Sequence, residues 1–511
     1  MRGEPGRRAP EPHSLLTQLA HVARACGERV AFVEGERRTT YAELWRQVER
    51  IGVALRHRIQ PGEPVAIVMD NCAELAATIY ATWWAGGIAA ALNPALKAPD
   101  LLALAQSCGA RWALLDPAMP TDPWQGGGVT ALALDGCLIE PLTAPPLEAP
   151  PCQHPAPLSS TAALIFTSGT TGQPKGVMLS HGNLASNVAA VQASLPMRAD
   201  DVTLCVLPFH YAYGGSVLHT HLALGATLVL ENSFMYPQRI TQRMAQCHVT
   251  AFHGVPSSYY LLLERGQLAS ADLQSLRYVA QAGGPMDPAR IDAFCALLPW
   301  VDFWVMYGQT EACSRLTTLP AHERLRKQGS VGRPLPGVEL RVVGPDGNAL
   351  PCGEVGEVCA RGDNVMQGYW QAPQDTAATL QGGWLRTGDI GHLDGEGFLF
   401  LHGRSRDIIK AGAHRVAPQE IEQIIQSVPG VRECAVVAMP DHLLGEVIRA
   451  CIVPAQDAPE ASALARDVLR TCRERLPLYK MPRHVDCFDA LPRTASGKIQ
   501  KHLIPARSGQ T

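Results

Sequence analysis

Short apolar runs alternate with helix-like stretches along most of this chain. Residues 65–69, 111–115 and 226–230 are apolar runs of strand length, and polar residues follow each of them. Such runs predict buried strands. A helix-like apolar pattern begins near Cys72, directly after the first run. Strands and helices in alternation predict an α/β fold in which helices cover mainly parallel sheets.

The longest apolar stretch, residues 79–92, is interrupted by Gly86 and Gly87. It is too short to span a bilayer, so no membrane segment is expected. Residues 1–12 are rich in Arg, Pro and Glu and lack the apolar centre of a signal peptide, and we expect them to form a disordered tail.

Length and charge narrow the functional classes. At roughly 150 residues per domain, a chain of 511 residues is expected to form more than one module. The net charge of −3 argues against nucleic acid as a main partner. The 15 cysteines are scattered without a metal-like cluster, which predicts a reduced, cytoplasmic compartment. Cys72 and Cys205 lie in apolar surroundings and are interpreted as small core residues.

A domain boundary is predicted near residues 403–407. A turn and strand precede this polar segment, and Pro418 opens an acidic helix start after it. We therefore divide the chain into a tail (1–12), an N-terminal domain (13–404) and a small α+β C-terminal domain (405–511). The proline-rich segment 143–160 is a second candidate boundary and is expected to be a surface loop.

A loop rich in hydroxyls and glycine follows the predicted strand 162–166. Glycine lets backbone N–H groups approach phosphate, hydroxyls donate hydrogen bonds, and lysine adds positive charge. The spacing does not fit a Walker loop, and an ordinary polar turn is the alternative. The candidate phosphate-binding residues are Thr167, Ser168, Gly169, Thr170, Thr171, Gly172 and Lys175.

Three further segments carry candidate chemistry. Residues 305–311 place an aromatic ring, a hydroxyl and the Glu311 carboxylate where a strand enters a loop, and a carboxylate beside a triphosphate is a common Mg²⁺ ligand. Asp389 follows Gly388, where it could accept bonds from ribose hydroxyls. Lys498 lies in the polar glycine turn of residues 491–499. Taken singly, a strand end and simple turns explain these segments equally well.

In their order along the chain, these segments resemble the signatures of the adenylate-forming superfamily, which includes acyl-CoA synthetases, firefly luciferase and adenylation domains of nonribosomal peptide synthetases. The resemblance runs from residues 39–44 to Lys498 and also includes segments 208–210, 356–358 with 368–369, and 440–441 with 445–446. It implies a large N-terminal domain of layered, mostly parallel sheets and a small, mobile C-terminal lid.

The resemblance also implies roles for individual residues. Thr167 to Lys175 would hold the phosphates of ATP, Glu311 would bind Mg²⁺, and Lys498 would contact the bridging oxygen and the substrate carboxylate. Asp389 and Arg404 would hold the ribose. The remaining nucleotide-binding candidates, several of them around the adenine, are Gly283, Gly284, Pro285, Tyr307, Gly308, Gln309 and Thr310.

The implied reaction joins a carboxylic acid to AMP, releases pyrophosphate, and then transfers the acyl group to a pantetheine thiol as a thioester. Mg²⁺ and Lys498 would neutralise the charge that develops. The lid would rotate between the two steps about a hinge. The hinge and thiol-passage residues would be Arg406, Lys410, Gly412, Ala413 and Arg415.

Two of these positions depart from the superfamily's pattern. The hinge position usually carries Asp or Lys, whereas this chain has Arg406. A glycine usually lines the pantetheine passage, whereas this chain has Ala413 after Gly412. The added methyl group narrows the passage and bears on thioester formation, with little consequence for adenylation.

The acid pocket is expected around segments 209–215 and 252–255. The aromatic lining suits an aryl or medium aliphatic acid, and the absence of an aspartate in the first segment argues against a free α-amino acid, whose buried ammonium would be unpaired. Packing of the aromatics at a sheet interface is the alternative. The acid-binding candidates are His210, Tyr211, Tyr213, Gly214, His253, Gly283 and Met306.

Three functions compete at this point. We expect an AMP-forming acid:CoA ligase that uses ATP, Mg²⁺ and CoA. A free-standing enzyme that loads a carrier protein is the alternative, and a luciferase-like oxygenase or an inactive binding protein is the third. Lys175, Glu311 and Lys498 together argue against an inactive protein.

Overall fold

The computed structural model describes residues 13–124, 127–133, 156–167, 174–404, 409–411, 414–416, 418–441, 445–456, 458–476, 478–493 and 499–505. Two compact units make up the chain. The larger unit comprises residues 1–340 and 360–385, and the smaller comprises residues 341–359 and 386–511. The predicted tail, residues 1–12, lies outside the described residues.

The first sheet of the larger unit has the order β15-β14-β13-β12-β11-β9-β10-β1-β2. Strands β13, β12, β11, β9, β10 and β1 are parallel neighbours, and antiparallel pairs flank them. The strands are β1 (Val30–Glu34), β2 (Arg37–Thr40), β9 (Val202–Cys205), β10 (Thr227–Leu230), β11 (Ala251–Gly254), β12 (Tyr278–Gln281), β13 (Asp302–Tyr307), β14 (Thr317–Leu319) and β15 (Ser330–Pro334).

The second sheet of the larger unit has the order β18-β8-β7-β4-β3-β5-β6. Its centre is parallel, and β8 runs antiparallel to both β7 and β18. The strands are β3 (Pro64–Val68), β4 (Ile88–Leu92), β5 (Trp112–Leu115), β6 (Thr130–Ala133), β7 (Thr161–Thr167), β8 (Lys175–Ser180) and β18 (Gly368–Tyr369).

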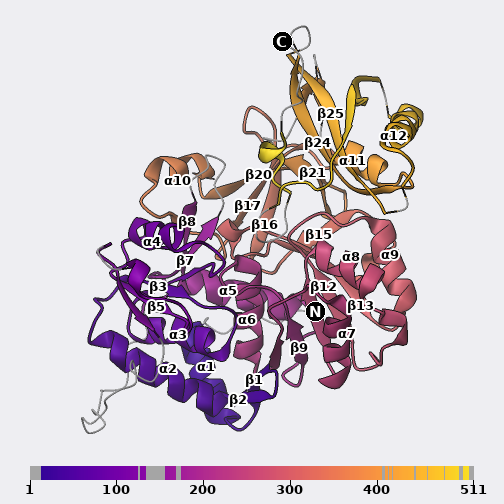
Figure 1. Cartoon of the computed structure of the whole chain (residues 1–511). Coiled ribbons are helices and arrows are strands. Elements are labelled where there is room, and N and C mark those ends of the chain that lie inside the picture. Colours follow the sequence, from indigo (N-terminus) through magenta and orange to yellow (C-terminus); the bar gives the residue numbers. More distant parts are fainter. Residues whose placement is uncertain are drawn as a thin grey trace, which may run out of the picture. The chain divides into compact units, whose positions relative to one another are not determined.

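Helices cover both sheets, and α5 and α6 lie between them (Figure 1). The α-helices of this unit are α1 (Leu15–Ala25), α2 (Tyr41–Arg56), α3 (Ala73–Trp84), α4 (Ala98–Ser107), α5 (His181–Ser194), α6 (Ala212–Leu224), α7 (Pro237–Gln246), α8 (Pro256–Arg265), α9 (Pro288–Leu297) and α10 (Pro373–Thr379). Its short elements are η1 (Asp122–Trp124), η3 (Leu268–Ser270), η4 (Thr310–Ala312), η5 (Ala321–Glu323) and β19 (Leu380–Gln381).

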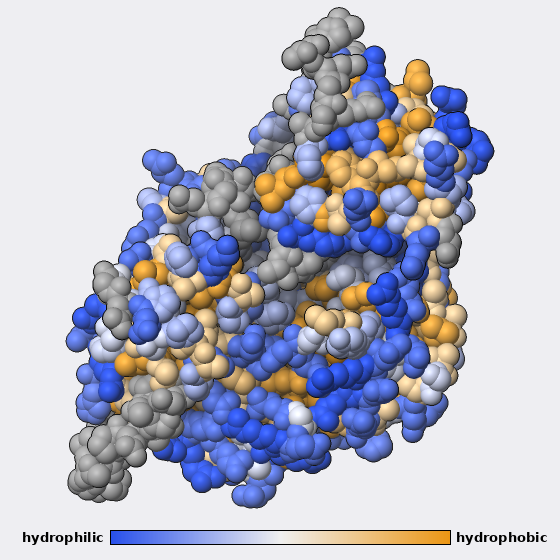
Figure 2. All heavy atoms as spheres, in the orientation of Figure 1, coloured by the Kyte–Doolittle hydropathy of each residue, from blue (hydrophilic) through white to orange (hydrophobic). Residues whose placement is uncertain are grey.

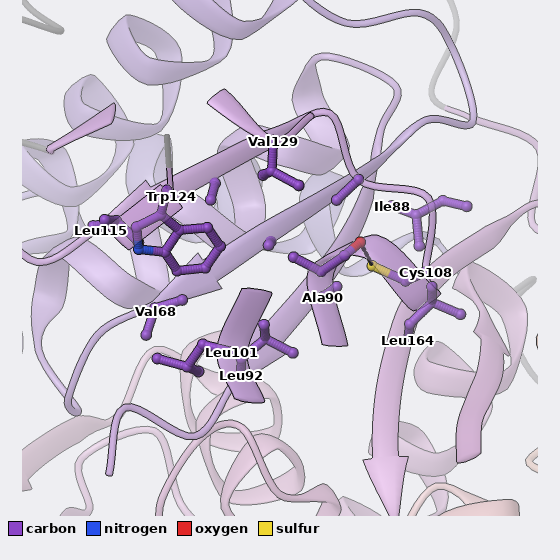
Figure 3. Close-up of a cluster of buried hydrophobic side chains, with 14 residues drawn as sticks. Val68, Ile88, Ala90, Leu92, Leu101, Cys108, Leu115, Trp124, Val129 and Leu164 are labelled. Carbon is purple, nitrogen blue, oxygen red and sulfur yellow. Dashed lines mark hydrogen bonds between the residues drawn. The ribbon is translucent and has the colours of Figure 1, made fainter. Parts of the chain in front are cut away.

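One face of the second sheet is closed by a compact apolar cluster. Residues of β3, β4 and β5 meet Leu101 from α4, and Trp124 from η1 is 2% exposed against them. Figure 3 shows the Trp124 ring beside Leu115. Burial of large side chains of this kind stabilises the fold by about 1.5–3 kcal/mol each. The cluster fixes the sheet whose β7–β8 hairpin carries the predicted phosphate loop.

The smaller unit contains two groups of strands. The strands β16 (Val338–Val343), β17 (Gly356–Gly362), β20 (Trp384–Leu393) and β21 (Leu399–Arg404) are hydrogen-bonded in that order, and the unit boundary cuts through the first three. The second sheet has the order β23-β22-β25-β24, with β26 beside β25. Its elements are β22 (Ile409–Ala411), β23 (His414–Val416), β24 (Val431–Asp441), β25 (Gly445–Pro454), β26 (His484–Cys487), α11 (Pro418–Gln426), α12 (Ala461–Arg475), η7 (Leu478–Lys480) and η8 (Lys501–Leu503).

Two apolar clusters hold this second sheet. One lies under α11 and α12, and the other includes Cys451, Leu491 and the half-buried Phe488. Figure 2 shows apolar atoms on the visible face of the smaller unit. The predicted α+β character of this part is confirmed by the helices and strands.

The fold class is as predicted, with a large N-terminal and a smaller C-terminal part. Residues 386–404, which include most of the β20–β21 hairpin, belong to the smaller unit. The compact units therefore separate upstream of the predicted boundary after residue 404, and a hinge at that boundary stays a prediction. Among the described helices, none is long and apolar enough to cross a membrane.

Candidate active site

Loops from four neighbouring strands meet at one edge of the first sheet. Strands β13, β12, β11 and β9 are consecutive and parallel, so their carboxyl ends share one edge. Tyr307 ends β13, Gly283 follows β12, His253 lies near the end of β11, and His210 follows β9. Ligands of open α/β sheets bind outside the carboxyl ends of the strands. The structure thus brings together candidates that are remote in sequence.

The predicted phosphate loop joins β7 to β8. The two strands pair antiparallel, with Thr167 opposite Lys175, and the Thr167 hydroxyl lies 3.5 Å from the Lys175 carbonyl oxygen. Both ends of the loop are therefore held by a hairpin. The remaining predicted phosphate-binding residues, Ser168, Gly169, Thr170, Thr171 and Gly172, lie outside the described residues.

Lys175 and Glu311 are linked through Tyr369. The Lys175 Nζ lies 2.6 Å from Asp375 and 5.3 Å from the centroid of the Tyr369 ring. The Tyr369 hydroxyl donates a hydrogen bond of 2.8 Å to Oε1 of Glu311. Burial and the Glu311 charge raise the pKa of Tyr369, so this hydroxyl stays protonated and can donate. The β7–β8 hairpin, which carries the predicted phosphate loop, and the Glu311 carboxylate are therefore connected through Tyr369.

Backbone pairing places Tyr369 at this site. Strand β18 pairs with β8, with Tyr369 opposite Val177, and the Met366 N–H donates to the Glu311 carbonyl oxygen at 2.9 Å. Residues 368–369 were predicted only as part of a family signature, and no role was predicted for Tyr369 or Asp375. Their contacts join residues far apart along the chain, and periodicity carries no signal for such contacts.

The predicted adenine-binding residues lie on adjacent loops. Gly283 has φ of 89°, a conformation that favours glycine, and Gln281 donates a side-chain hydrogen bond to the Gly284 carbonyl oxygen at 2.7 Å. Pro285 follows in the same loop, and Tyr307 is 9% exposed at the end of the neighbouring strand. Their position suits the predicted role, which stays a prediction.

The loop after Tyr307 has little conformational freedom. A Cβ on Gly308 would lie 2.2 Å from the Ser314 carbonyl oxygen. Cys313 and Ser314 both have positive φ, and the Leu316 N–H closes the loop on the Tyr307 carbonyl oxygen at 2.8 Å. Gln309 and Thr310 lie in this loop, and the buried Gln309 Nε2 has no hydrogen-bond partner in the described part of the chain. Such an over-determined backbone is typical of ligand-binding segments.

His210 is buried and electrically neutral. Burial lowers its pKa to about 4, and its Nε2 has no hydrogen-bond partner within the described residues. The Tyr211 ring packs at 4.3 Å between centroids. Asn71 holds the preceding loop, because it accepts from the Phe209 N–H and donates to the Leu207 carbonyl oxygen, both at 2.8 Å. Sequence reasoning had not identified Asn71 as a positioning residue.

Helix α6 carries two further acid-binding candidates, Gly214 and Tyr213. A Cβ on Gly214 would lie 2.0 Å from the Pro208 carbonyl oxygen, so only glycine allows the helix to approach the His210 loop. The Tyr213 hydroxyl donates to the Ala280 carbonyl oxygen at 2.9 Å, and its ring centroid lies 6.3 Å from that of His253. Met306 is buried in an apolar cluster with Tyr213. Acid binding by these side chains stays a prediction.

The smaller unit carries the remaining candidates. Arg404 Nε lies 3.1 Å from Asp389, and the two residues are opposite each other on β20 and β21. Lys410 and Arg415 are opposite each other on β22 and β23. Arg493 and Ile499, which flank the predicted Lys498 turn, form an antiparallel bridge. Arg406, Gly412, Ala413 and Lys498 themselves lie outside the described residues.

The sequence is similar to known protein families and to individual enzymes over most of its length. The sequence matches the family of AMP-binding enzymes over residues 19–370 and the C-terminal domain of AMP-binding enzymes over residues 420–498. It is 36% identical to a feruloyl-CoA synthase from an Amycolatopsis species, covering 95% of this chain and 97% of that protein. It is 34% identical to an indoleacetate–CoA ligase from Aromatoleum aromaticum, covering 91% and 92%.

Solved structures give the same result. The o-succinylbenzoate CoA synthetase of Bacillus subtilis, solved with its acyl-adenylate intermediate, has a TM-score of 0.85 and 29% identity, covering 97% of this chain and 99% of that one. The same enzyme solved with ATP and a magnesium ion has a TM-score of 0.84. The fold is that of a nucleotide-binding α/β enzyme. The chain belongs to the AMP-binding enzyme family of the adenylate-forming superfamily.

Proposed function

We propose that this protein is an AMP-forming acid:CoA ligase. It joins a carboxylic acid to AMP with release of pyrophosphate and then transfers the acyl group to the thiol of CoA. The observation that carries the proposal is the linkage of Lys175, Tyr369 and Glu311 at the end of the phosphate hairpin. It supplies a cation and an anion beside a loop suited to phosphate. Relatives that match nearly the whole chain are named CoA ligases.

In the first step, this chain must overcome repulsion between a carboxylate and a polyanionic triphosphate. Lys175 and the hydroxyls of the phosphate loop bind the phosphates, and Lys498 stabilises the charge that develops between acid and nucleotide. Binding in line with the acid converts a bimolecular reaction into a unimolecular one. Asp389 and Arg404 hold the ribose, while Gly283 and Tyr307 enclose the adenine.

The residues present fit a magnesium ion at Glu311. Its Oε1 accepts from Tyr369, and Oε2 makes no hydrogen bond to the described residues, which leaves an anionic oxygen of the type Mg²⁺ prefers. The ion, when bound, neutralises phosphate charge. Tyr369 orients the carboxylate for this contact.

His210 binds the acid as a neutral hydrogen-bond donor. Because burial keeps the imidazole neutral, it can donate a hydrogen bond to an oxygen of the acid or of the α-phosphate, and it takes no proton from solvent at neutral pH. A small cavity of about 40 Å³ borders His210, Ala212 and Ser216. This volume holds only a few water molecules, so the acid itself needs further space.

The substrate class follows from the lining of the site. Tyr211, Tyr213 and His253 supply aromatic rings, which suit an aryl or medium aliphatic acid. Relatives named for ferulate and indoleacetate support an aryl acid. We favour CoA as acceptor, and a carrier protein is the alternative. Both ATP and CoA are cytoplasmic metabolites, and we place the reaction in the cytoplasm.

The acceptor and the reaction type are tested together. The purified protein is mixed with ATP, Mg²⁺, a panel of aryl and aliphatic acids, and either CoA or a phosphopantetheinylated carrier protein. We expect AMP, pyrophosphate and an acyl-CoA. Acylation of the carrier protein alone would favour the alternative. Release of ADP instead of AMP would refute the proposed function.

A further inference from the structure

Arg315 is a buried arginine without an acidic partner. It is 1% exposed, and the described residues provide no ion pair for it. Its guanidinium stacks on the Tyr213 ring at 4.1 Å, one of its nitrogens lies 3.3 Å from the Ser314 carbonyl oxygen, and its Nε has no hydrogen-bond partner there. A buried charge is costly unless it is paired.

Arg449 provides a direct comparison within the same chain. It is the other described arginine that is buried, at 5% exposure. Its Nε lies 2.6 Å from Asp486, and its NH1 donates to the Pro505 carbonyl oxygen at 2.7 Å. The fold thus provides an acidic partner for Arg449, whereas the described residues provide none for Arg315.

A second buried polar group beside Tyr213 also lacks hydrogen-bond partners among the described residues. His253 packs edge-on to Tyr213, and both of its ring nitrogens are buried without a partner among the described residues. Burial lowers the pKa of His253 far below its usual value, with contributions from His221 and Arg315. His253 is therefore neutral and can donate one hydrogen bond. A guanidinium and an imidazole beside one aromatic ring form a donor set suited to a carboxylate.

The backbone holds Arg315 in this position. Asn364 donates to the Arg315 carbonyl oxygen at 2.8 Å, and Asn187 donates to the same oxygen at 3.4 Å. The preceding residues, Cys313 and Ser314, have φ of 51° and 78°, which turns the chain inward after Glu311. Arg315 thus lies at the inner end of the loop that begins at Tyr307 and carries Glu311.

We propose that Arg315 recognises a second carboxylate on the acid substrate, remote from the carboxylate that is adenylated. The inference rests on the proposed acid activation and specifies its substrate as a dicarboxylic acid. The reacting carboxylate is placed near His210 at the start of α6, and the second one meets Arg315 and His253 beside Tyr213.

The test compares matched acids on the wild-type protein. Adipate is paired with hexanoate, and terephthalate with benzoate, and a length series of diacids from succinate to suberate finds the best span. Binding is measured by calorimetry and adenylation by pyrophosphate release without CoA. We expect the best diacid to exceed its monoacid by about 10²-fold in kcat/KM, because a monoacid leaves the buried arginine unpaired.

Variants test whether Arg315 causes the preference for diacids. Arg315→Met should abolish the preference, mainly through KM, and Arg315→Lys should retain part of it. Arg290→Met is the matched control, because Arg290 also stacks on a tyrosine ring, at 5.6 Å from Tyr260, but is exposed. It should leave the preference unchanged.

The outcomes separate the two proposals. Equal binding of diacids and monoacids by the wild-type protein would overturn the inference whether or not Arg315→Met folds. A preference that persists in Arg315→Met would overturn it as well. If diacids bind preferentially but no pyrophosphate is released, the proposed function fails and the assignment of Arg315 stands.

Discussion

Single side chains of the site are positioned by partners that lie far away in the sequence. Glu311 depends on Tyr369, the His210 loop on Asn71, and the Arg315 backbone on Asn364. The sequence predicts Glu311 and His210 as site residues because their motifs are local. It could not identify Tyr369 or Asn71 as supports, because their contacts arise only when distant strands and loops meet.

Tyr369→Phe should weaken the dependence of adenylation on Mg²⁺. The variant removes the 2.8 Å hydrogen bond to Glu311 and keeps the ring beside Lys175. We expect a fall of about 10-fold in pyrophosphate release at limiting Mg²⁺, since a bond to a charged group contributes about 1.5–3 kcal/mol. Raising the Mg²⁺ concentration should restore part of the rate.

The control for this variant is Tyr41→Phe. The Tyr41 hydroxyl donates to the Ala226 carbonyl oxygen at 2.6 Å in the core of the same unit. This change should lower stability without altering the Mg²⁺ dependence. An unchanged Mg²⁺ response in Tyr369→Phe would show that the Glu311 contact is incidental.

His181→Phe should reduce the sensitivity of the fold to acid. Burial lowers the pKa of His181 to about 4 from 6.5. Below pH 6.5 the unfolded chain binds a proton that the folded chain does not, so the free energy of unfolding falls as pH falls from 6.5 towards 4. The variant removes up to about 3 kcal/mol of this loss.

Urea unfolding at pH 7 and at pH 4.5 measures the effect. Buried His219 and His221, with pKa values lowered to about 3 and about 4, keep some acid sensitivity in the variant. The exposed His57→Phe serves as control and should leave the difference between the two pH values unchanged. An equal difference in His181→Phe and wild type would contradict the account.

Secondary-structure elements were predicted best where one local pattern decides them. The apolar runs at 65–69, 111–115 and 226–230 become β3, β5 and β10, and the predicted helix at Pro418 is α11. Cys205 is buried as expected, whereas Cys72 lies at the edge of the core. Its side chain is only partly buried and accepts from the Leu75 N–H at 3.3 Å, so it caps α3. Capping by sulfur is weak and leaves no clear pattern in the sequence.

The junction between the His210 loop and α6 depends on one glycine. In Gly214→Ala the new Cβ would clash with the Pro208 carbonyl oxygen at 2.0 Å. We expect a loss of about 1–3 kcal/mol in stability and a lower rate of adenylation through displacement of His210. Thermal unfolding and pyrophosphate release measure the two effects.

Gly215→Ala is the matched control for this junction. Its Cβ would meet only the Phe209 carbonyl oxygen, at 3.3 Å, and alanine favours a helix over glycine by about 1 kcal/mol. The variant should therefore be close to wild type in both measurements. Equal losses in the two variants would show that close approach at Gly214 is not what positions His210.

The whole molecule divides its candidate residues between two units. The larger unit holds Lys175, Glu311 and His210, whereas Lys498 and Ala413 belong to the smaller one. The sequence predicts a boundary after residue 404, which stays a prediction, while residues 386–404 belong to the smaller compact unit. We predict that adenylation uses residues of both units, Lys498 included, and that thiol transfer depends on residue 413 of the smaller unit.

Ala413→Leu should block thiol transfer selectively. By its place in the family pattern, residue 413 is predicted to line the thiol passage, where a larger side chain would compete with pantetheine for space. Thioester formation from a preformed acyl-adenylate should fall by about 10-fold or more, while acid-dependent pyrophosphate exchange stays at the wild-type rate. Ala413→Gly should be equal to wild type or faster. Equal losses in both half-reactions would assign residue 413 to folding of the smaller unit.

The most direct test of acid activation is ATP–pyrophosphate exchange in the absence of any thiol. The wild-type protein should catalyse exchange only when a carboxylic acid is present. Lys498→Ala should lower the rate by about 10²–10³, while ATP binding and thermal stability stay close to wild type. Exchange at the wild-type rate in Lys498→Ala, or no exchange by the wild-type protein with any acid of the panel, would contradict the account.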